Sequence, residues 1–222
     1  MDRPTVVIHN TISLDGQLGG FPVDEGLYYE LAAAIPHDAV LSGSGTMLAA
    51  ARAQGVDLTG EDVPRTGPAG DGPLLVVVDS RGRLTRLDWL RDLPFWRDVV
   101  ILGSRSTPEP HRDRLRRAGV DCLVTGEDHA DLGAALTELA ARYAVTSVRV
   151  DAGGTLNGHL LRLGLVDELS VVVAPHLAGT AAPLAAAAGT PRLTLIGTDE
   201  LRAGQVRLRY AVSAPSDAAR GD

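Results

Sequence analysis

The sequence predicts an α/β fold with a mostly parallel central sheet, helices on both faces and a C-terminal antiparallel hairpin. Two observations indicate this class. Apolar, β-branched runs alternate with segments of helical periodicity as far as Ala174, and short glycine-bearing turns join them. Two further strands, at 192–198 and 206–212, are then too close together for a crossover helix, so they should pair antiparallel.

The first half of the chain alternates strands with helices. Runs of aliphatic and β-branched residues predict strands at 5–12, 39–41, 74–78 and 99–102. The helix after the first strand should begin at Asp24 or Glu25 and end before Pro36, because its leucines recur at helical spacing. The next helix is expected to run for about ten residues from Met47, after a small-residue turn at 42–46.

The second half continues the alternation. Helices at 112–118 and 131–143 flank a strand at 120–124. A short strand at 148–150 is followed by Gly153 and Gly154, and then by a helix that should stop at Gly164. A buried strand at 169–174 completes a β-α-β unit, which predicts parallel strands and a right-handed crossover. Residues 1–212 are expected to form one domain, and 213–222 a disordered tail.

Composition excludes several classes of function. The net charge is −7 without a basic stripe, which argues against nucleic-acid binding. All 21 basic residues are arginine, so there is no lysine for a Schiff base, a P-loop or a Ser-Lys dyad. The six histidines show no metal-ligand spacing, so no metal is expected. Without a signal peptide or an apolar run of about 20 residues, we expect a soluble, cytoplasmic protein that does not bind membranes.

Glycine turns after strands are the first candidate sites. Gly153 and Gly154 stand between a strand and a helix, where free N–H groups attract a pyrophosphate, although a tight turn between packed elements explains them equally well. The turn at 42–46 has the same context. Asp15 follows the first strand and either holds its own turn or faces a ligand, for example as a proton donor.

Two buried strands are each followed by a serine and an arginine. Ser80 and Arg81, with Arg83 nearby, come after 74–78, and Arg105 comes after 99–102. An arginine fork with a serine hydroxyl is the combination that recognises a 2′-phosphate on adenosine. Exposed loop arginines without any role are the alternative.

Five segments, in this order, resemble the reductase domain of riboflavin biosynthesis, the C-terminal half of the bifunctional pyrimidine deaminase/reductase, which shares the dihydrofolate reductase fold. They cover nearly the whole chain. The segments are Ser13-Leu14-Asp15-Gly16, Gly43-Ser44-Gly45-Thr46, Val77-Val78-Asp79-Ser80, the run from Asp151 to Gly158, and the run from Gly164 to Pro175.

The resemblance implies an NADPH-dependent reductase, usually a homodimer, with the nicotinamide across the carboxyl ends of the central strands. By position, Thr46 and the backbone of Ile12 would lie at the nicotinamide half, and Ser44 in the same turn is a further cofactor candidate. Ser80 would lie at the adenosine 2′-phosphate, for which Arg81 and Arg105 are the candidates given above by the serine-arginine turns. The pyrophosphate would be held by Gly153, Gly154, Thr155 and Leu156. Asp151 stands where the family has a glutamate that faces the substrate, so Asp15 and Asp151 are the catalytic candidates.

The sequence departs from the family on the substrate side. Where the family continues with an acidic pair, a proline and arginines that grip the substrate's ribose phosphate, this chain has residues 49–54, of which only Arg52 is basic. The predicted function is NADPH-dependent reduction of a small pyrimidine-, pterin- or imine-like substrate. The alternatives are a true aminouracil phosphate reductase, a dihydrofolate reductase-like or secondary-pathway reductase, and a nucleotide-binding homologue without catalysis. NADH or a flavin in place of NADPH also stays open.

Overall fold

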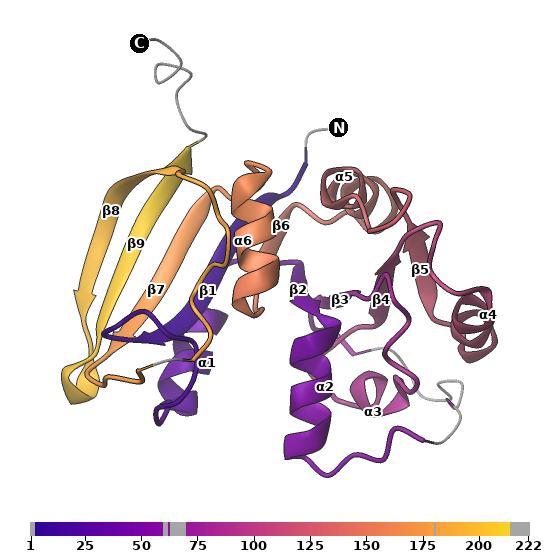
Figure 1. Ribbon diagram of the computed structural model, residues 1–222, viewed down its shortest axis with the longest axis horizontal. Coiled ribbons are helices and arrows are strands. Elements are labelled where there is room, and N and C mark those ends of the chain that lie inside the picture. The colour runs from indigo at the N-terminus through magenta and orange to yellow at the C-terminus, as the bar shows by residue number, and fades with distance from the viewer. Residues whose placement is uncertain (1–2, 60–61, 63–69, 180, 214–222) are drawn as a thin grey trace. The chain divides into compact units, whose positions relative to one another are not determined.

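The computed structural model describes residues 3–59, 62, 70–179 and 181–213. The chain forms two compact units. The first consists of Met1–Pro4 and His37–Val148, and the second of Thr5–Pro36 and Arg149–Asp222. The strand β6 (Ser147–Val150) carries the chain from the first unit into the second (Figure 1).

Four parallel strands form the sheet of the first unit, in the order β5-β4-β3-β2. They are β2 (Ala39–Gly43), β3 (Leu74–Val78), β4 (Val99–Gly103) and β5 (Asp121–Val124). The helices of this unit are α2 (Ser44–Ala53), α3 (Asp88–Arg91), α4 (Glu109–Ala118) and α5 (Leu132–Tyr143). Because all four strands run the same way, their carboxyl ends, with the turns that follow, lie along one edge of this sheet.

The core of the first unit covers both faces of these strands. Leu75, Val77 and Ile101 pack with Leu115 of α4 and with Leu90 of α3. Leu74, Val76, Val100 and Leu102, which alternate with them along the strands, are also buried, as the aliphatic runs at 74–78 and 99–102 predicted for a parallel sheet.

The second unit combines a parallel strand pair with a C-terminal hairpin. Its elements are β1 (Thr5–Ser13), α1 (Glu25–Ala33), α6 (Gly154–Arg162), β7 (Glu168–Ala174), β8 (Arg192–Glu200) and β9 (Val206–Ser213). Strand β1 pairs in parallel with β7, β7 pairs antiparallel with β9, and β9 pairs antiparallel with β8.

The helices α1 and α6 pack on opposite faces of β1. The His9 side chain stacks on Tyr28 of α1, with 5.0 Å between the ring centroids. Asn10, the next residue of β1, accepts a hydrogen bond of 2.9 Å from Asn157 of α6. Successive side chains of a strand point to opposite faces, so each helix covers one side of the sheet.

The predicted fold class is confirmed, with a mostly parallel sheet, helices and a C-terminal antiparallel hairpin. The expected start of the second helix at Met47 was wrong, because α2 already begins at Ser44. The helix α3 was not predicted. Strand β9 includes Ser213, the first residue of the expected tail, and 214–222 lie outside the described residues. The assignment of 1–212 to a single domain stays a prediction.

Candidate functional site

The predicted site residues belong to both units. Ile12, Asp15, Asp151, Gly153, Gly154, Thr155 and Leu156 lie in the second unit, and Ser44, Thr46, Ser80, Arg81 and Arg105 lie in the first. Each group lies at the carboxyl ends of its own parallel strands or in the turns that follow them.

Asp15 holds the turn after β1. Its Oδ1 accepts hydrogen bonds from the Ser13 hydroxyl at 2.5 Å and from the Ala178 N–H at 3.0 Å, and its Oδ2 accepts one from the Gly179 N–H at 2.8 Å. These bonds, the one from Ser13 first, lower the pKa of the carboxyl, which is therefore ionised at neutral pH. Of the two interpretations of Asp15, the contacts support the structural one. Ile12, three residues earlier in β1, is half-buried.

The helix α6 starts directly after the predicted glycine turn. Gly153 is its N-cap, with an extended backbone, and none of the described side chains caps the helix. A Cβ on Gly153 would meet no atom of the described residues within 4 Å, so they leave the space beside it open. The exposed Thr155 and the half-buried Leu156 complete the first turn. Uncapped N–H groups beside open space are the arrangement that binds an anion.

Gly154 and Gly158, unlike Gly153, lie where there is no room for a side chain. A Cβ on Gly154 would lie 2.0 Å from the Pro183 carbonyl oxygen, and one on Gly158 would lie 1.7 Å from that of Ala186. The backbone of the alanine-rich segment, defined here as residues 181–187, therefore packs directly on α6. For Gly154, tight packing is thus at least part of the explanation.

Asn157 joins α6 to the segments around it through hydrogen bonds, and the sequence analysis assigned it no role. It is fully buried, and its amide nitrogen lies 2.9 Å from both the Asn10 side-chain oxygen and the Leu184 carbonyl oxygen. It lies 3.3 Å from the Ala152 carbonyl oxygen as well. The same side chain therefore fixes α6, β1, the alanine-rich segment and the backbone beside Asp151.

Asp151 follows β6 and is partly buried. Burial raises its pKa, although the positive charge of Arg149 and a hydrogen bond from the Tyr28 hydroxyl both act in the opposite direction. A carboxyl group with a raised pKa retains its proton to a higher pH than an ordinary aspartate does. Asp151 can therefore donate a proton under conditions in which Asp15 cannot.

Sequence reasoning missed the polar residues around Asp151. Arg149 is 5% exposed, and its Nε and Nη1 atoms have no hydrogen-bond partner among the described residues. His9 is fully buried, and its Nδ1 lies 3.0 Å from the Ser170 hydroxyl. Burial, followed by the charge of Arg149, lowers the pKa of His9 to about 4, so the imidazole is neutral at pH 7. A charged residue within the apolar strand Val148–Val150 was the signal that could have revealed this cluster.

In the first unit, Ser44 and Thr46 lie in the first turn of α2 and not in a turn before it. Gly43 is the N-cap, and no side chain caps this helix either. The Arg83 guanidinium approaches the same turn, with Nη1 3.9 Å from the position that a Cβ on Gly45 would take. An arginine beside an uncapped helix start is a second arrangement suited to phosphate.

The other predicted phosphate contacts differ from one another. The Ser80 hydroxyl oxygen accepts a hydrogen bond of 2.9 Å from the Ala130 N–H, which leaves its proton for another acceptor. Arg81 is exposed. Arg105 pairs with Glu127 at 2.8 Å, and both side chains are more than two-thirds exposed. Arg105 thus belongs to a surface ion pair, whereas Ser80 and Arg81 stay candidates for the phosphate contact.

Among the described residues, each unit has a helix that begins without a side-chain cap and that includes predicted site residues. These helices are α2 in the first unit, with an arginine beside its start, and α6 in the second. The described residues contain no group of three His, Cys, Asp or Glu side chains that could hold a metal ion. A helix long and apolar enough to cross a membrane is likewise absent from the part of the chain that the structure describes.

Comparison with known proteins identifies the family. The model of the RibD C-terminal domain matches residues 4–206. A protein of Methanothermobacter thermautotrophicus named 2,5-diamino-6-ribosylamino-4(3H)-pyrimidinone 5′-phosphate reductase is 31% identical over 184 residues, which are 80% of each chain. The chain is therefore a reductase, an enzyme of the oxidoreductase class. It belongs to the RibD C-terminal domain family, which confirms the resemblance noted in the sequence.

Two further comparisons agree. The riboflavin biosynthesis protein RibD of Escherichia coli is 35% identical over 110 residues, which are 49% of this chain but only 28% of RibD. The crystal structure of a pyrimidine reductase-like protein from Corynebacterium diphtheriae superposes with a TM-score of 0.68. It is 20% identical and covers 96% of this chain and 93% of its own, so it supports the fold alone.

Proposed function

We propose that the chain is an NADPH-dependent reductase of an aminopyrimidine that carries a ribosylamino group. The observation that carries this proposal is the end of β6, where a carboxyl group with a raised pKa, Asp151, stands two residues before the uncapped start of α6 at Gly153. This short segment would therefore provide both a proton donor and an anion-binding helix start.

Asp151 is the proposed proton donor. Reduction of a C=N bond adds a hydride to carbon and a proton to nitrogen, so the enzyme must provide the proton. The pKa of Asp15 is lowered by its hydrogen bonds, and the pKa of Asp151 is raised by burial. Of the two carboxyl groups, only Asp151 suits this role, and Asp15 holds the loop beside β1.

NADPH, when bound, supplies the hydride. The start of α6 would bind the pyrophosphate through the N–H groups beside Gly153, because no described side chain caps this turn and the space beside Gly153 is open. The Leu156 N–H, at the end of the same turn, already donates to the Gly153 carbonyl oxygen at 3.1 Å. In the first unit, the first turn of α2 with Ser44 and Thr46 would lie at the nicotinamide half, and Ser80 with Arg81 at the 2′-phosphate. We leave Arg105 out of this set because its guanidinium pairs with Glu127.

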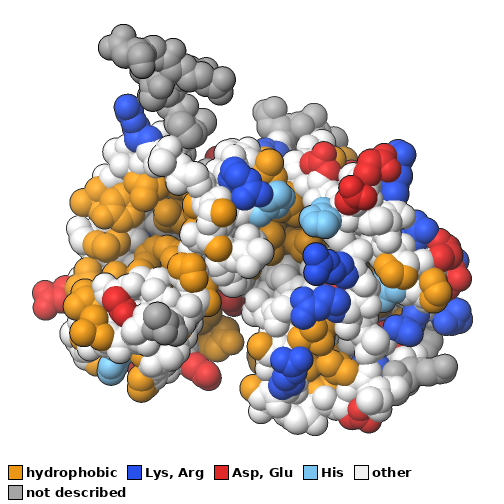
Figure 2. Space-filling model, viewed as in Figure 1, with side chains coloured by type: hydrophobic (Ala, Val, Ile, Leu, Met, Phe, Trp, Pro, Cys, Tyr) orange, Lys and Arg blue, Asp and Glu red, His pale blue; other side chains and the backbone are white. Residues whose placement is uncertain are grey.

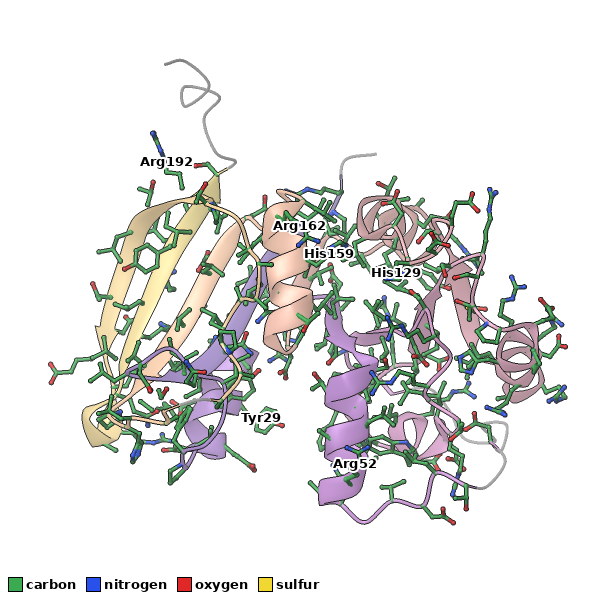
Figure 3. All side chains as sticks on the ribbon, in the orientation of Figure 1. Tyr29, Arg52, His129, His159, Arg162 and Arg192 are labelled. Carbon is green, nitrogen blue, oxygen red and sulfur yellow. The ribbon has the colours of Figure 1, made fainter. Side chains whose placement is uncertain are left out.

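The substrate class comes from the relatives. The Methanothermobacter protein is named for a diaminopyrimidinone with a ribosylamino 5′-phosphate. In its open-chain form, a ribosylamino group is an imine, which is the bond that the proposed chemistry reduces. Arg52, exposed on α2, is the residue in this chain that we assign to the phosphate (Figure 3).

We also propose that the protein is a homodimer through the face of its C-terminal hairpin. Leu193 and Leu195 of β8 are 44% and 53% exposed. They pair with Val212 and Tyr210 of β9, so four apolar side chains share one face of the hairpin. Figure 2 shows hydrophobic side chains gathered over β8 and β9. A second copy would cover this surface and its edge strand.

The proposed assembly has a matched test. Leu195→Glu should shift the mass measured by light scattering from dimer to monomer. Thr194→Glu, on the other face of the same strand, should leave it unchanged. A monomeric parent protein would contradict the assembly without affecting the reductase assignment.

A nucleotide titration tests the proposed function. Binding to the folded state raises the melting temperature by an amount that grows with the ratio of ligand concentration to Kd, so NADPH should raise it more than the same concentration of NADH does. NADPH oxidation should then require an aminopyrimidinone with a ribosylamino phosphate. Binding of NADPH without turnover of any such substrate would favour a nucleotide-binding protein without catalysis, and no shift with either nucleotide would refute the proposal.

A further inference from the structure

Tyr28 of α1 contacts both His9 and Asp151. Its ring stacks on the His9 imidazole, with 5.0 Å between centroids and 25° between planes. Its hydroxyl oxygen lies 3.3 Å from the His9 carbonyl oxygen and also forms a hydrogen bond with the Asp151 carboxyl. The hydroxyl therefore lies between a main-chain acceptor and the proposed proton donor.

A hydroxyl in this position can serve both protonation states of Asp151. When the carboxyl is ionised, the tyrosine donates its proton to it. When the carboxyl is protonated, it can donate to the tyrosine oxygen, and the tyrosine proton can then turn to the His9 carbonyl. The carboxyl group is thus held in one orientation before and after it gives up its proton.

The charged and titratable groups around Asp151 and its neighbours come from four elements. Tyr28 and Tyr29 lie on α1, Arg149 on β6 and His9 on β1. Burial, followed by the negative charge of Asp151, raises the pKa of Tyr28 well above its ordinary value, so its hydroxyl keeps its proton. His9 is neutral at pH 7 because its pKa is lowered to about 4. The positive charge of Arg149 acts to lower the pKa of both Tyr28 and Asp151, and a second cation, Arg207 of β9, acts on His9.

We infer that Tyr28 is a positioning residue for the reaction, which fixes the Asp151 carboxyl through its hydroxyl and spans the gap to the His9 carbonyl. This rests on the proposed role of Asp151 as proton donor. The tyrosine takes no part in hydride transfer and binds neither substrate nor cofactor. Its effect is on the orientation of the carboxyl and on the pH at which the carboxyl loses its proton.

The neighbouring tyrosine provides a matched control. Tyr29 is 60% exposed and stacks edge-on against Tyr28, with 5.2 Å between centroids (Figure 3). It has an electrostatic interaction with Asp151 but no hydrogen bond to it. The variants Tyr28→Phe and Tyr29→Phe therefore remove the same atom from adjacent residues, and only the first removes a bond to the carboxyl.

The first experiment is the pH dependence of kcat for NADPH oxidation in both variants. A protonated Asp151 is required, so kcat should fall as the pH rises through its pKa. In Tyr28→Phe this limb should move to higher pH by roughly 0.5 to 1 unit, because the lost bond stabilised the ionised form. The rate on the plateau should fall roughly fivefold while KM stays constant. Tyr29→Phe should match the parent, and identical profiles for both variants would overturn the inference.

A second experiment needs no turnover. Aspartate carboxyl carbons labelled with carbon-13 report the pKa of Asp151 by NMR, with Asp151→Asn to assign the signal. Tyrosine ring carbons report Tyr28, whose pKa should fall in Asp151→Asn. If the parent enzyme reduces no pyrimidinone, the proposed function fails, yet these titrations still decide whether Tyr28 and Asp151 share a bond. Unchanged titrations would refute that bond, even in an active enzyme.

Discussion

The backbone of Ala186 lies against Gly158 so closely that a methyl group on residue 158 would come within 1.7 Å of the Ala186 carbonyl oxygen. Four residues earlier on the same helix, Gly154 accepts a hydrogen bond of 2.8 Å from the Ala186 N–H. The alanine-rich segment is therefore seated on α6 by its backbone, and α6 carries the open turn at Gly153. The position of this segment and the start of α6 are physically linked.

Gly158→Ala should displace the alanine-rich segment. Backbone atoms cannot yield as a flexible side chain does, so we expect a loss of about 1–3 kcal/mol in the free energy of unfolding. Gly153→Ala is the control, because its Cβ would meet nothing and its backbone is extended. Urea denaturation measures both variants. A loss below about 0.5 kcal/mol for Gly158→Ala would contradict this account of the packing.

Asp15 should make the free energy of unfolding depend on pH in the acidic range. Its folded pKa lies below the ordinary value of 3.8, so its contribution is complete above that pH and is lost as the pH falls through the folded pKa. Asp15→Asn should therefore be less stable than the parent at neutral pH, and the difference should shrink below about pH 4. Melting temperatures from pH 3 to 8 test this. A difference that is constant over that range would mean that ionisation of Asp15 contributes nothing to stability.

Two arginines should differ in their effect on cofactor binding. The Arg83 guanidinium approaches the uncapped start of α2, whereas Arg105 pairs with Glu127. We expect Arg83→Ala to weaken NADPH binding about five- to tenfold, which is the loss of one charge-assisted contact. Arg105→Ala should change the Kd less than twofold. Calorimetric titration measures both, and the reverse order would place the phosphate near Arg105.

Local signals predicted most of the elements. The runs of Val and Leu at 74–78 and 169–174 correspond to β3 and β7. A strand that is buried on both faces is a continuous apolar run, so it can be recognised from its own residues alone. The N-caps of α1 and α5 are Asp24 and Asp131, which the sequence placed at the helix starts. The hairpin of β8 and β9 followed from the short spacing between two strands.

Distant contacts account for what the sequence did not predict. The helix α3 starts where the N–H groups of Leu87 and Asp88 meet the carboxylate of Asp62, which precedes them by 25 residues or more. The cluster around Asp151 joins Tyr28 of α1 to a strand more than 100 residues away. The open space beside Gly153 and the crowding at Gly154 are indistinguishable in the sequence, because both are glycines in one turn.

The pH profile of Asp151→Asn tests the central claim most directly. Removal of a general acid lowers the rate by roughly 10²–10⁴-fold, and the limb that belongs to Asp151 should disappear. The rise in melting temperature with NADPH should persist, because the amide keeps the shape of the site. A variant that retains full turnover with the pH profile of the parent would contradict the role of Asp151 as proton donor.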